Sequence, residues 1–233
     1  MKIKLTPTES ISAIVDTPPA PRACLVLAHG AGAGMHHEFM AAMALGLKAR
    51  GIATLRFQFP FMEKGSRRPD TPAVAHAAVR AAVAAAAKRF PRLPLFAGGK
   101  SFGGRMTTQA QAIDVLPGVE GLVLLGFPLH PPKKPSLDRA AHLEAVKVPM
   151  LFLQGTRDEL ADLALVKQVT SALGRRAKLH VVDAADHGFD VLVRSGRTRL
   201  EVREELLDTM ARWMTRRSVR AKAVPLKKKS PNR

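Results

Sequence analysis

Cysteine is almost absent from this chain: Cys24 is the only one among 233 residues. A single thiol cannot form an intrachain disulfide, which excludes the disulfide-stabilised scaffolds of small secreted proteins. Cys24 lies in the apolar run Ala23–Ala28, so we expect a buried, inert thiol. The chain also has no tyrosine and a single tryptophan, Trp213. This cysteine usage fits an intracellular protein.

Long apolar runs are missing as well. No stretch approaches the ~18 to 20 consecutive apolar residues that span a bilayer. The N-terminal residues also lack the charged-then-apolar pattern and small-residue cleavage site of a leader. We therefore expect a soluble, cytoplasmic protein. Hydrophobic residues make up 46% of the chain and charged residues 24%, which is ordinary for one large globular domain.

Acidic residues are scarce: 19 Asp and Glu stand against 37 Lys and Arg, a formal net charge of +18. The charge is uneven, because Arg216–Arg233 holds eight Lys or Arg residues and no acid. We expect residues 1–215 to form a single domain and residues 216–233 to form a flexible basic tail. A weak contact of the tail with nucleic acid or an anionic membrane is the alternative to a solvated segment.

Strand patterns alternate with helical patterns from Ala23 onward, after an expected hairpin at the N-terminus. This alternation predicts an α/β fold with a mostly parallel sheet and helices on both faces. The expected strands are Lys2–Thr6, Ser10–Asp16, Ala23–Ala28, Ile52–Phe57, one beginning at Leu93, Gly121–Leu125, Val148–Gln154 and Lys178–Val182. The expected helices are His37–Ala49, Pro72–Phe90, one ending near Val115, Glu159–Leu173 and Thr198–Thr215. Only Phe127–Val146, which begins in a Pro-rich irregular stretch, could serve as a lid, so we expect a short lid or none.

A serine between glycines follows one of these strands: residues 99–103 read GKSFG, the pattern G-x-S-x-G around Ser101. Small residues on both sides permit a sharp strand-to-helix turn that exposes the hydroxyl. The same letters end a phosphate-binding loop, G-x-x-x-x-G-K-S. Its first glycine is replaced here by Pro94, which has no N–H to offer a phosphate. An ordinary glycine-rich connector is the other alternative.

Two further polar residues follow the last two expected strands, at the edge of the sheet where sites of parallel sheets lie. Asp158 follows the first of these strands and His187 the second, so the chain order is Ser, Asp, His, as in α/β-hydrolases. Asp158 could instead cap a helix that begins at Glu159, and His187 could be a hydrogen-bonded loop histidine. The loop of His187 also holds competing acids, Asp183, Asp186 and Asp190.

These three residue types together can activate a hydroxyl group. A neutral imidazole takes the serine proton, and a carboxylate orients the imidazole and stabilises its charged form. We therefore expect Ser101 as nucleophile, His187 as base and Asp158 as acid. The backbone N–H groups of Phe102 and Ala31 are the expected oxyanion hole.

Four residues near these segments are expected to contact substrate: Gly30, Lys100, Phe59 and Phe127. The glycine-rich segment His29–Gly34 does not fit a dinucleotide site, because Met35 stands where the third glycine of G-x-G-x-x-G would be. The other histidines lack a set of Cys or acidic partners. We expect no cofactor and no metal.

The motifs HGAGAG, RFQFPF, GGKSFGG, GFPLHPP, QGTRDEL and DHGF, in this order, resemble the α/β-hydrolase superfamily near its dienelactone-hydrolase-like members. More narrowly, they resemble the small hydrolase-like domain shared by a testis-expressed protein and a subunit of the NSL histone-acetyltransferase complex. The resemblance spans roughly Ala23 to Met214 and implies the same Ser101, Asp158 and His187. Dienelactone hydrolases themselves usually carry Cys as nucleophile, where this chain has Ser101.

The leading hypothesis is a serine hydrolase of carboxylesterase type that cleaves a small-molecule ester or thioester through an acyl-enzyme. A peptidase could use the same three residues. From another class, the chain could be a catalytically idle hydrolase fold that serves as an interaction module, with the basic tail as its contact.

Overall fold

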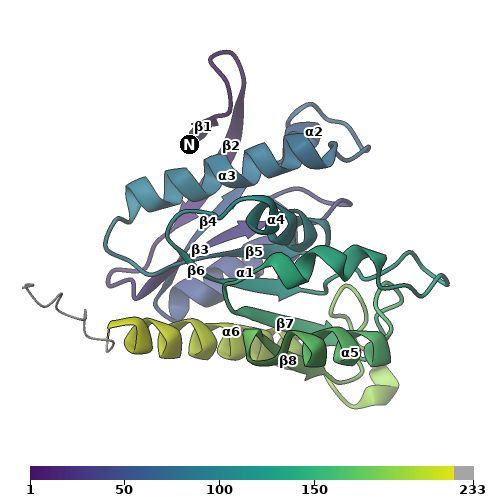
Figure 1. Cartoon of the computed structure of the whole chain (residues 1–233). Coiled ribbons are helices and arrows are strands. Elements are labelled where there is room, and N and C mark those ends of the chain that lie inside the picture. The colour runs from purple at the N-terminus through teal and green to yellow at the C-terminus, as the bar shows by residue number, and fades with distance from the viewer. Residues whose placement is uncertain (223–233) are drawn as a thin grey trace, which may run out of the picture.

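Eight strands form one sheet in the order β1-β2-β4-β3-β5-β6-β7-β8 (Figure 1). The computed structural model describes residues 1–222, of which 217–222 by their backbone alone. The strands from β3 to β8 are mutually parallel, whereas β1 and β2 run antiparallel as an N-terminal hairpin at one edge. The predicted fold class and hairpin are confirmed. The strands are β1 (Lys2–Lys4), β2 (Ser10–Asp16), β3 (Ala23–Ala28), β4 (Ile52–Phe57), β5 (Leu95–Lys100), β6 (Val119–Leu125), β7 (Met150–Gly155) and β8 (Ala177–Val182).

The central strands are covered on both faces. Every residue of β3, β4 and β7 is buried, as expected for apolar runs in a parallel sheet. Cys24 is among them, and burial raises the pKa of its thiol to about 12, which makes it inert at neutral pH. No helix in residues 1–222 is long and apolar enough to cross a membrane.

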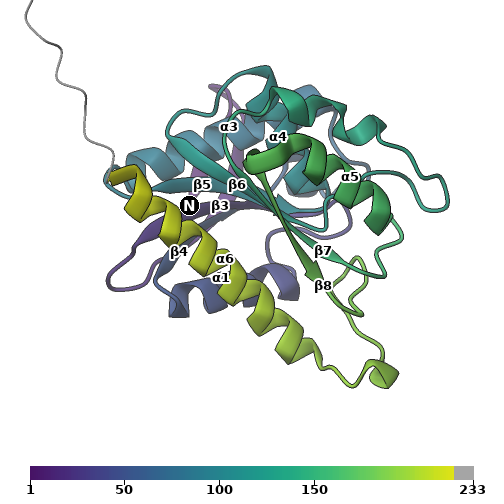
Figure 2. The ribbon, with the colours of Figure 1, turned by 60° about the horizontal axis from the view of Figure 1, so that its bottom comes forward.

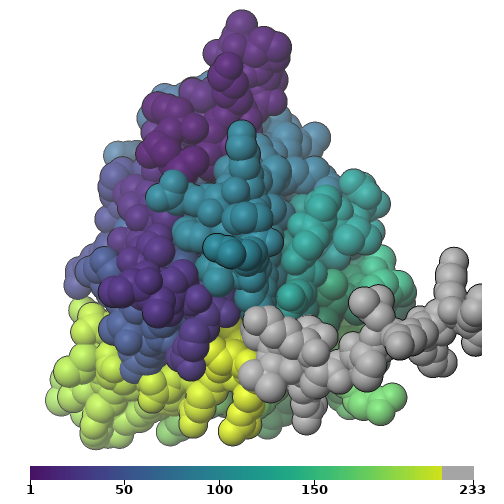
Figure 3. All heavy atoms as spheres, turned by 90° about the vertical axis from the view of Figure 1, so that its left-hand side faces the viewer, coloured from purple at the N-terminus to yellow at the C-terminus, as the bar shows by residue number. Residues whose placement is uncertain are grey.

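Helices form a layer on each face of this sheet (Figures 1 and 2). On one face, α3, α4 and α5 enclose one apolar cluster, and on the other α1 and α6 enclose a second. Figure 3 views the molecule from the side that carries the N-terminal hairpin and the end of α6. The α-helices are α1 (Glu38–Ala49), α2 (Pro60–Glu63), α3 (Pro72–Arg89), α4 (Phe102–Ile113), α5 (Leu163–Leu173) and α6 (Arg199–Lys222); the 3₁₀ helices are η1 (Asp138–Ala145), η2 (Gly174–Arg176) and η3 (Val193–Ser195).

Several helices differ from the sequence-based prediction. The short helix α2 and the 3₁₀ helix η1 lie in stretches expected to be irregular, because tertiary packing can stabilise single turns that periodicity does not reveal. Helix α5 begins at Leu163 rather than Glu159, since Asp162 caps it. Helix α6 continues past Thr215 to Lys222, so the first residues assigned to the basic tail are helical. Residues 223–233 of that predicted tail lie outside the described part of the chain.

Candidate active site

The turn between β5 and α4 holds Ser101 in a strained conformation. Its φ of 50° and ψ of −114° lie where side-chain-bearing residues are rarely found. Its N–H donates to the carbonyl of Leu125 on β6 at 2.9 Å. Gly103 passes so close to β3 that a Cβ atom on it would lie 2.5 Å from the carbonyl oxygen of His29. This position therefore requires glycine, as the G-x-S-x-G pattern predicts.

Three side chains from three loops meet at the carboxyl edge of the sheet. His187 Nε2 lies 2.9 Å from Ser101 Oγ. At the other side of the ring, His187 Nδ1 lies 2.8 Å from Oδ2 and 2.9 Å from Oδ1 of Asp158. An ionised carboxylate only accepts hydrogen bonds, so Nδ1 carries the proton and Nε2 can accept one from the serine hydroxyl. The structure brings the three predicted residues together; their catalytic roles stay predictions.

Asp158 is held by groups other than the histidine. Its side chain is fully buried, Gln154 Nε2 donates to Oδ2 at 2.5 Å, and the N–H of Leu160 donates to Oδ1 at 2.9 Å. The alternative that Asp158 caps α5 is wrong, because Asp162 accepts the first N–H groups of that helix. The carboxylate of Asp158 is thereby oriented toward the imidazole by partners on its own strand and loop.

Two of the competing acids in the His187 loop are engaged elsewhere. Asp186 Oδ1 accepts the N–H groups of Gly188 at 2.8 Å and Asp190 at 2.9 Å, which closes the loop on itself. Asp190 forms an ion pair with Arg199 at 2.8 Å. Neither carboxylate takes the place of Asp158 at the imidazole.

The two predicted oxyanion donors come from segments on either side of Ser101. Phe102 is the first residue of α4, so its N–H has no acceptor within the helix. The glycine-rich loop after β3 lies beside the serine, since a Cβ atom on Gly30 would be 3.8 Å from Ser101 Cβ. Ala31 is the next residue of that loop. Both predicted donor segments therefore lie next to Ser101, and their role as an oxyanion hole stays a prediction.

His29 fixes this loop, a role that the sequence reading missed. The side chain is buried, Nδ1 donates to the carbonyl of Gly30 at 2.7 Å, and Nε2 accepts the N–H of Phe59 at 3.0 Å. Burial lowers the pKa of His29 to about 4, so the ring is neutral at pH 7. The sequence feature that could have revealed this role is a histidine directly after a buried strand and directly before a glycine-rich loop.

The predicted substrate residues fall in different places. Gly30 lies beside Ser101, but Phe59 and Phe127 are corrected to core residues, with exposed fractions of 0% and 2%. Phe59 packs edge-to-face on Phe102 with ring centroids 5.2 Å apart, and Phe127 packs on Phe152 at 5.9 Å. Large apolar rings gain more from such burial than from lining an open cleft.

Lys100 also turns inward rather than toward a substrate space. Its Nζ donates to the carbonyl oxygen of His187 at 2.5 Å and lies 5.5 Å from the centre of the Phe189 ring. The prediction placed Lys100 beside the nucleophile as a substrate contact. Its ammonium group instead contacts the loop that carries the predicted base.

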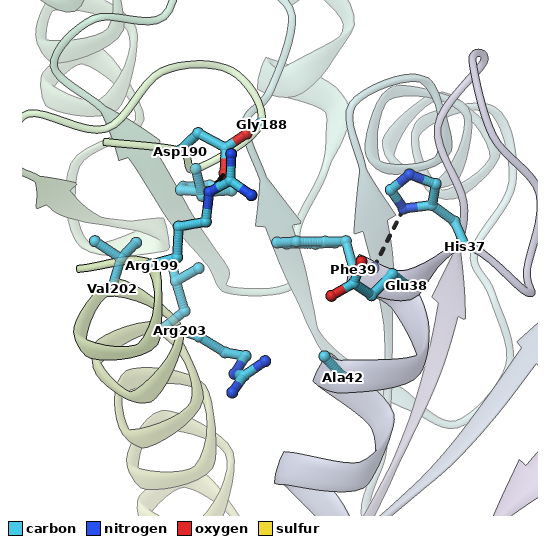
Figure 4. A pocket seen from close by; sticks show the side chains of 11 residues that line it. His37, Glu38, Phe39, Ala42, Gly188, Asp190, Arg199, Val202 and Arg203 are labelled. Atoms are coloured by element: carbon cyan, nitrogen blue, oxygen red, sulfur yellow. Dashed lines mark hydrogen bonds and ion pairs between the residues drawn. The ribbon is translucent and has the colours of Figure 1, made fainter. Parts of the chain in front are cut away.

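A pocket of about 240 Å³ lies beside this loop, between the first turns of α1 and α6 (Figure 4). Phe39 projects into it and stacks on Phe189 with ring centroids 5.9 Å apart. Arg199 and Arg203 extend into it from α6, Arg199 toward Asp190. The pocket therefore combines aromatic and charged side chains. Gly188, the residue after His187, is among the residues that line it.

Within residues 1–222, no group of three or more His, Cys, Asp or Glu side chains could hold a metal ion. The histidines described above have other partners instead.

Comparisons with known proteins agree with this architecture. A family described as an alpha/beta hydrolase domain matches residues 21–215. The dienelactone hydrolase from Anabaena variabilis superposes with a TM-score of 0.75 at 17% identity, covering 93% of this chain and 95% of that one. An alpha-beta serine hydrolase homologue from Coxiella burnetii gives 0.71 at 20% identity, with 90% and 96% covered. A Xanthomonas campestris protein described as an α/β serine hydrolase without lid gives 0.71 at 22%, with 92% and 94% covered.

At these identities the solved structures show a shared fold. The narrower resemblance to the domain shared by the testis-expressed protein and the NSL-complex subunit stays a prediction, as does a cytoplasmic location.

Proposed function

The chain belongs to a family of alpha/beta hydrolase domains, and from this premise we propose that it is a serine hydrolase that cleaves a carboxylic ester or thioester through an acyl-enzyme. The observation that carries the proposal is the continuous hydrogen-bonded series from Ser101 Oγ through His187 to the buried Asp158. Each atom in this series has the donor or acceptor character that general-base activation of a hydroxyl requires.

In the first step, neutral His187 takes the proton of Ser101 through Nε2 while Oγ attacks the carbonyl carbon of the substrate. The imidazole becomes positively charged, and the adjacent carboxylate of Asp158 stabilises that charge and keeps the ring oriented. Because Asp158 is fully buried, this interaction is little screened by water.

The carbonyl oxygen becomes an oxyanion in the tetrahedral intermediate, and we assign its stabilisation to the N–H groups of Phe102 and Ala31. Collapse of the intermediate expels the alcohol or thiol, which receives the proton from the imidazolium. His187 then takes a proton from a water molecule, which attacks the carbonyl carbon of the acyl-enzyme. The imidazolium returns the proton to Ser101 Oγ as the carboxylic acid leaves. His29 holds the loop of Ala31 in place through its hydrogen bonds with Gly30 and Phe59.

The segment between β6 and β7 supports a substrate of modest size. It folds as an irregular turn and the short 3₁₀ helix η1, which packs against α4 through a 2.8 Å hydrogen bond between Thr108 Oγ1 and His142 Nε2. So short a cover favours an open site and acyl groups of modest size.

The test is hydrolysis of p-nitrophenyl esters of increasing acyl length. We expect measurable turnover that declines for long chains, and a fall of at least about 1,000-fold in kcat for Ser101→Ala, because the nucleophile is lost. Ser171→Ala is the matched control, since Ser171 is an exposed residue of α5 and its loss should leave turnover unchanged. Equal turnover in both variants would contradict the proposal.

A further inference from the structure

The side chain of Lys100 joins the nucleophile turn to the loop of the predicted base. Lys100 is the last residue of β5, directly before Ser101. Its Nζ donates a 2.5 Å hydrogen bond to the main-chain carbonyl of His187 and lies 5.5 Å from the centre of the Phe189 ring. The two contacts fix the loop on both sides of Gly188.

The ammonium group also lies close to the side chains of the site. Gly126, at the end of β6, has a φ of 62°, and a Cβ atom on it would lie 3.2 Å from Lys100 Nζ, 3.5 Å from Asp158 Oδ2 and 3.5 Å from His187 Cε1. Lys100 Nζ and the imidazole are therefore within about 7 Å of each other, a range at which unit charges interact appreciably in a protein. Glycine at position 126 leaves the room in which these groups meet.

We propose that Lys100 is a positioning residue, whose ammonium group holds the main chain of His187 in the place from which its imidazole reaches Ser101. This inference rests on the proposed function and deepens it. Lys100 does not touch the reacting atoms; it acts through His187. A lysine in the second position of G-x-S-x-G is thus used to connect the nucleophile turn to the base loop.

The same ammonium group contributes a charge to the site. Burial lowers the pKa of Lys100 to about 8, against the opposing effect of Asp158 and Asp186, so the group is mostly protonated at pH 7. A protonated amine donates a charge-assisted hydrogen bond, which is stronger than one from a neutral donor, so Lys100 can hold the carbonyl group of His187 firmly.

Three substitutions separate the bond from the charge. Lys100→Met removes both, Lys100→Gln removes the charge but keeps a donor, and Lys100→Arg keeps both. If this hydrogen bond holds the base loop, Lys100→Met should displace the His187 ring from Ser101, Lys100→Gln should displace it less, and Lys100→Arg should displace it least.

The direct readout is the NMR signal of the His187 Nδ1–H proton in its hydrogen bond to Asp158, assigned by its loss in His187→Gln. We expect this signal to be lost or broadened in Lys100→Met and kept in Lys100→Arg. We also expect kcat of Lys100→Met to fall by roughly 10- to 100-fold with little change in KM, because a displaced base loses alignment. Arg157→Met is the matched control, because Arg157 Nη1 donates to the carbonyl of Ala184 at 3.2 Å in the same loop rather than to that of His187. Its removal should change neither the signal nor the rate.

An unchanged Nδ1–H signal in a folded Lys100→Met protein overturns the proposal, whatever the rate of that variant. If Lys100→Met does not fold, Lys100→Gln decides by the same criterion. The NMR signal needs no substrate, so the two proposals fail separately. A signal that is lost in Lys100→Met, in a protein that hydrolyses no ester, supports the role of Lys100 and contradicts the proposed reaction, whereas an unchanged signal beside Ser101-dependent hydrolysis does the reverse.

Discussion

A serine hydroxyl becomes a nucleophile only through its neighbours, and in this protein each neighbour is held by a further residue. His187 is held by Asp158 at its ring and by Lys100 at its main chain. Asp158 in turn accepts hydrogen bonds from Gln154. On the proposed account, activity depends on several side chains that never touch the substrate.

The buried His29 should make the free energy of unfolding depend on pH. Its folded-state pKa of about 4 lies below the ordinary value of 6.5, so the unfolded chain takes up the proton first on acidification. The stability that neutral His29 contributes is fully present above pH 6.5 and is lost as the pH falls to 4. This loss amounts to about 3 kcal/mol in free energy of unfolding.

Urea unfolding at pH 7 and pH 4.5 tests this prediction. His29→Asn has no titrating ring, so its unfolding free energy should fall less than that of the wild type on acidification, although it is the less stable protein at pH 7. Because all other titrating groups are shared, the difference between the two falls isolates His29. Equal falls would show that His29 is not held neutral by the fold.

The predicted catalytic residues could be found in the sequence because each stands at a fixed place after a buried strand. The direction in which a side chain points could not be predicted in the same way. Phe59 and Phe127 were expected at the substrate and lie in the core, and Lys100 was expected to face a substrate and faces His187. These outcomes depend on contacts between residues far apart in the chain, which one sequence does not display.

At the scale of elements, the close passage of α4 across β3 determines the position of Ser101. A Cβ atom on Gly103 would lie 2.5 Å from the carbonyl oxygen of His29 and 2.6 Å from that of Ala28. Since backbone atoms cannot move aside cheaply, Gly103→Ala must shift α4 away from the sheet. We expect a loss of about 1 to 3 kcal/mol in stability and, from misplacement of Ser101, roughly 100-fold in kcat.

Urea unfolding and p-nitrophenyl acetate hydrolysis measure both effects. Gly32→Ala is the control for stability, because a Cβ atom at that position meets nothing within 4 Å, and its unfolding free energy should change by less than about 0.5 kcal/mol. A Gly103→Ala protein as stable and active as the wild type would contradict the importance of this close approach.

Continuous apolar runs made the strands of the parallel sheet predictable: the bounds of β3 and β4 match the expected ranges residue for residue. The ends of helices were less predictable. The sequence predicts a start of α5 at Glu159, but the N–H of Leu160 donates to the side chain of Asp158 and the helix starts only after the cap at Asp162. The exact helix end is set by side-chain contacts that the apolar pattern does not show.

At the scale of the molecule, two apolar layers share one sheet, and we propose that residues 1–215 fold as a single domain. Trp213 reports on one layer, since it is buried on α6 with its ring 5.6 Å from that of Phe96. The chain has no tyrosine, so its intrinsic fluorescence comes from this one residue at 295 nm excitation.

Urea unfolding followed by Trp213 fluorescence and by far-ultraviolet circular dichroism should give one coincident transition, because the layer of α1 and α6 and the opposite layer cannot separate without exposing the sheet. Distinct midpoints for the two signals would show that the layer containing α6 unfolds on its own. Trp213→Phe serves as the fluorescence blank.

The most direct test of the central claim is the reaction of the intact protein with a fluorophosphonate probe, followed by digestion and mass mapping. The serine oxygen would form a bond to phosphorus and expel fluoride, so we expect one adduct, on Ser101, that is absent from Ser101→Ala and strongly reduced in His187→Gln. No adduct, or an adduct that persists in Ser101→Ala, would contradict it.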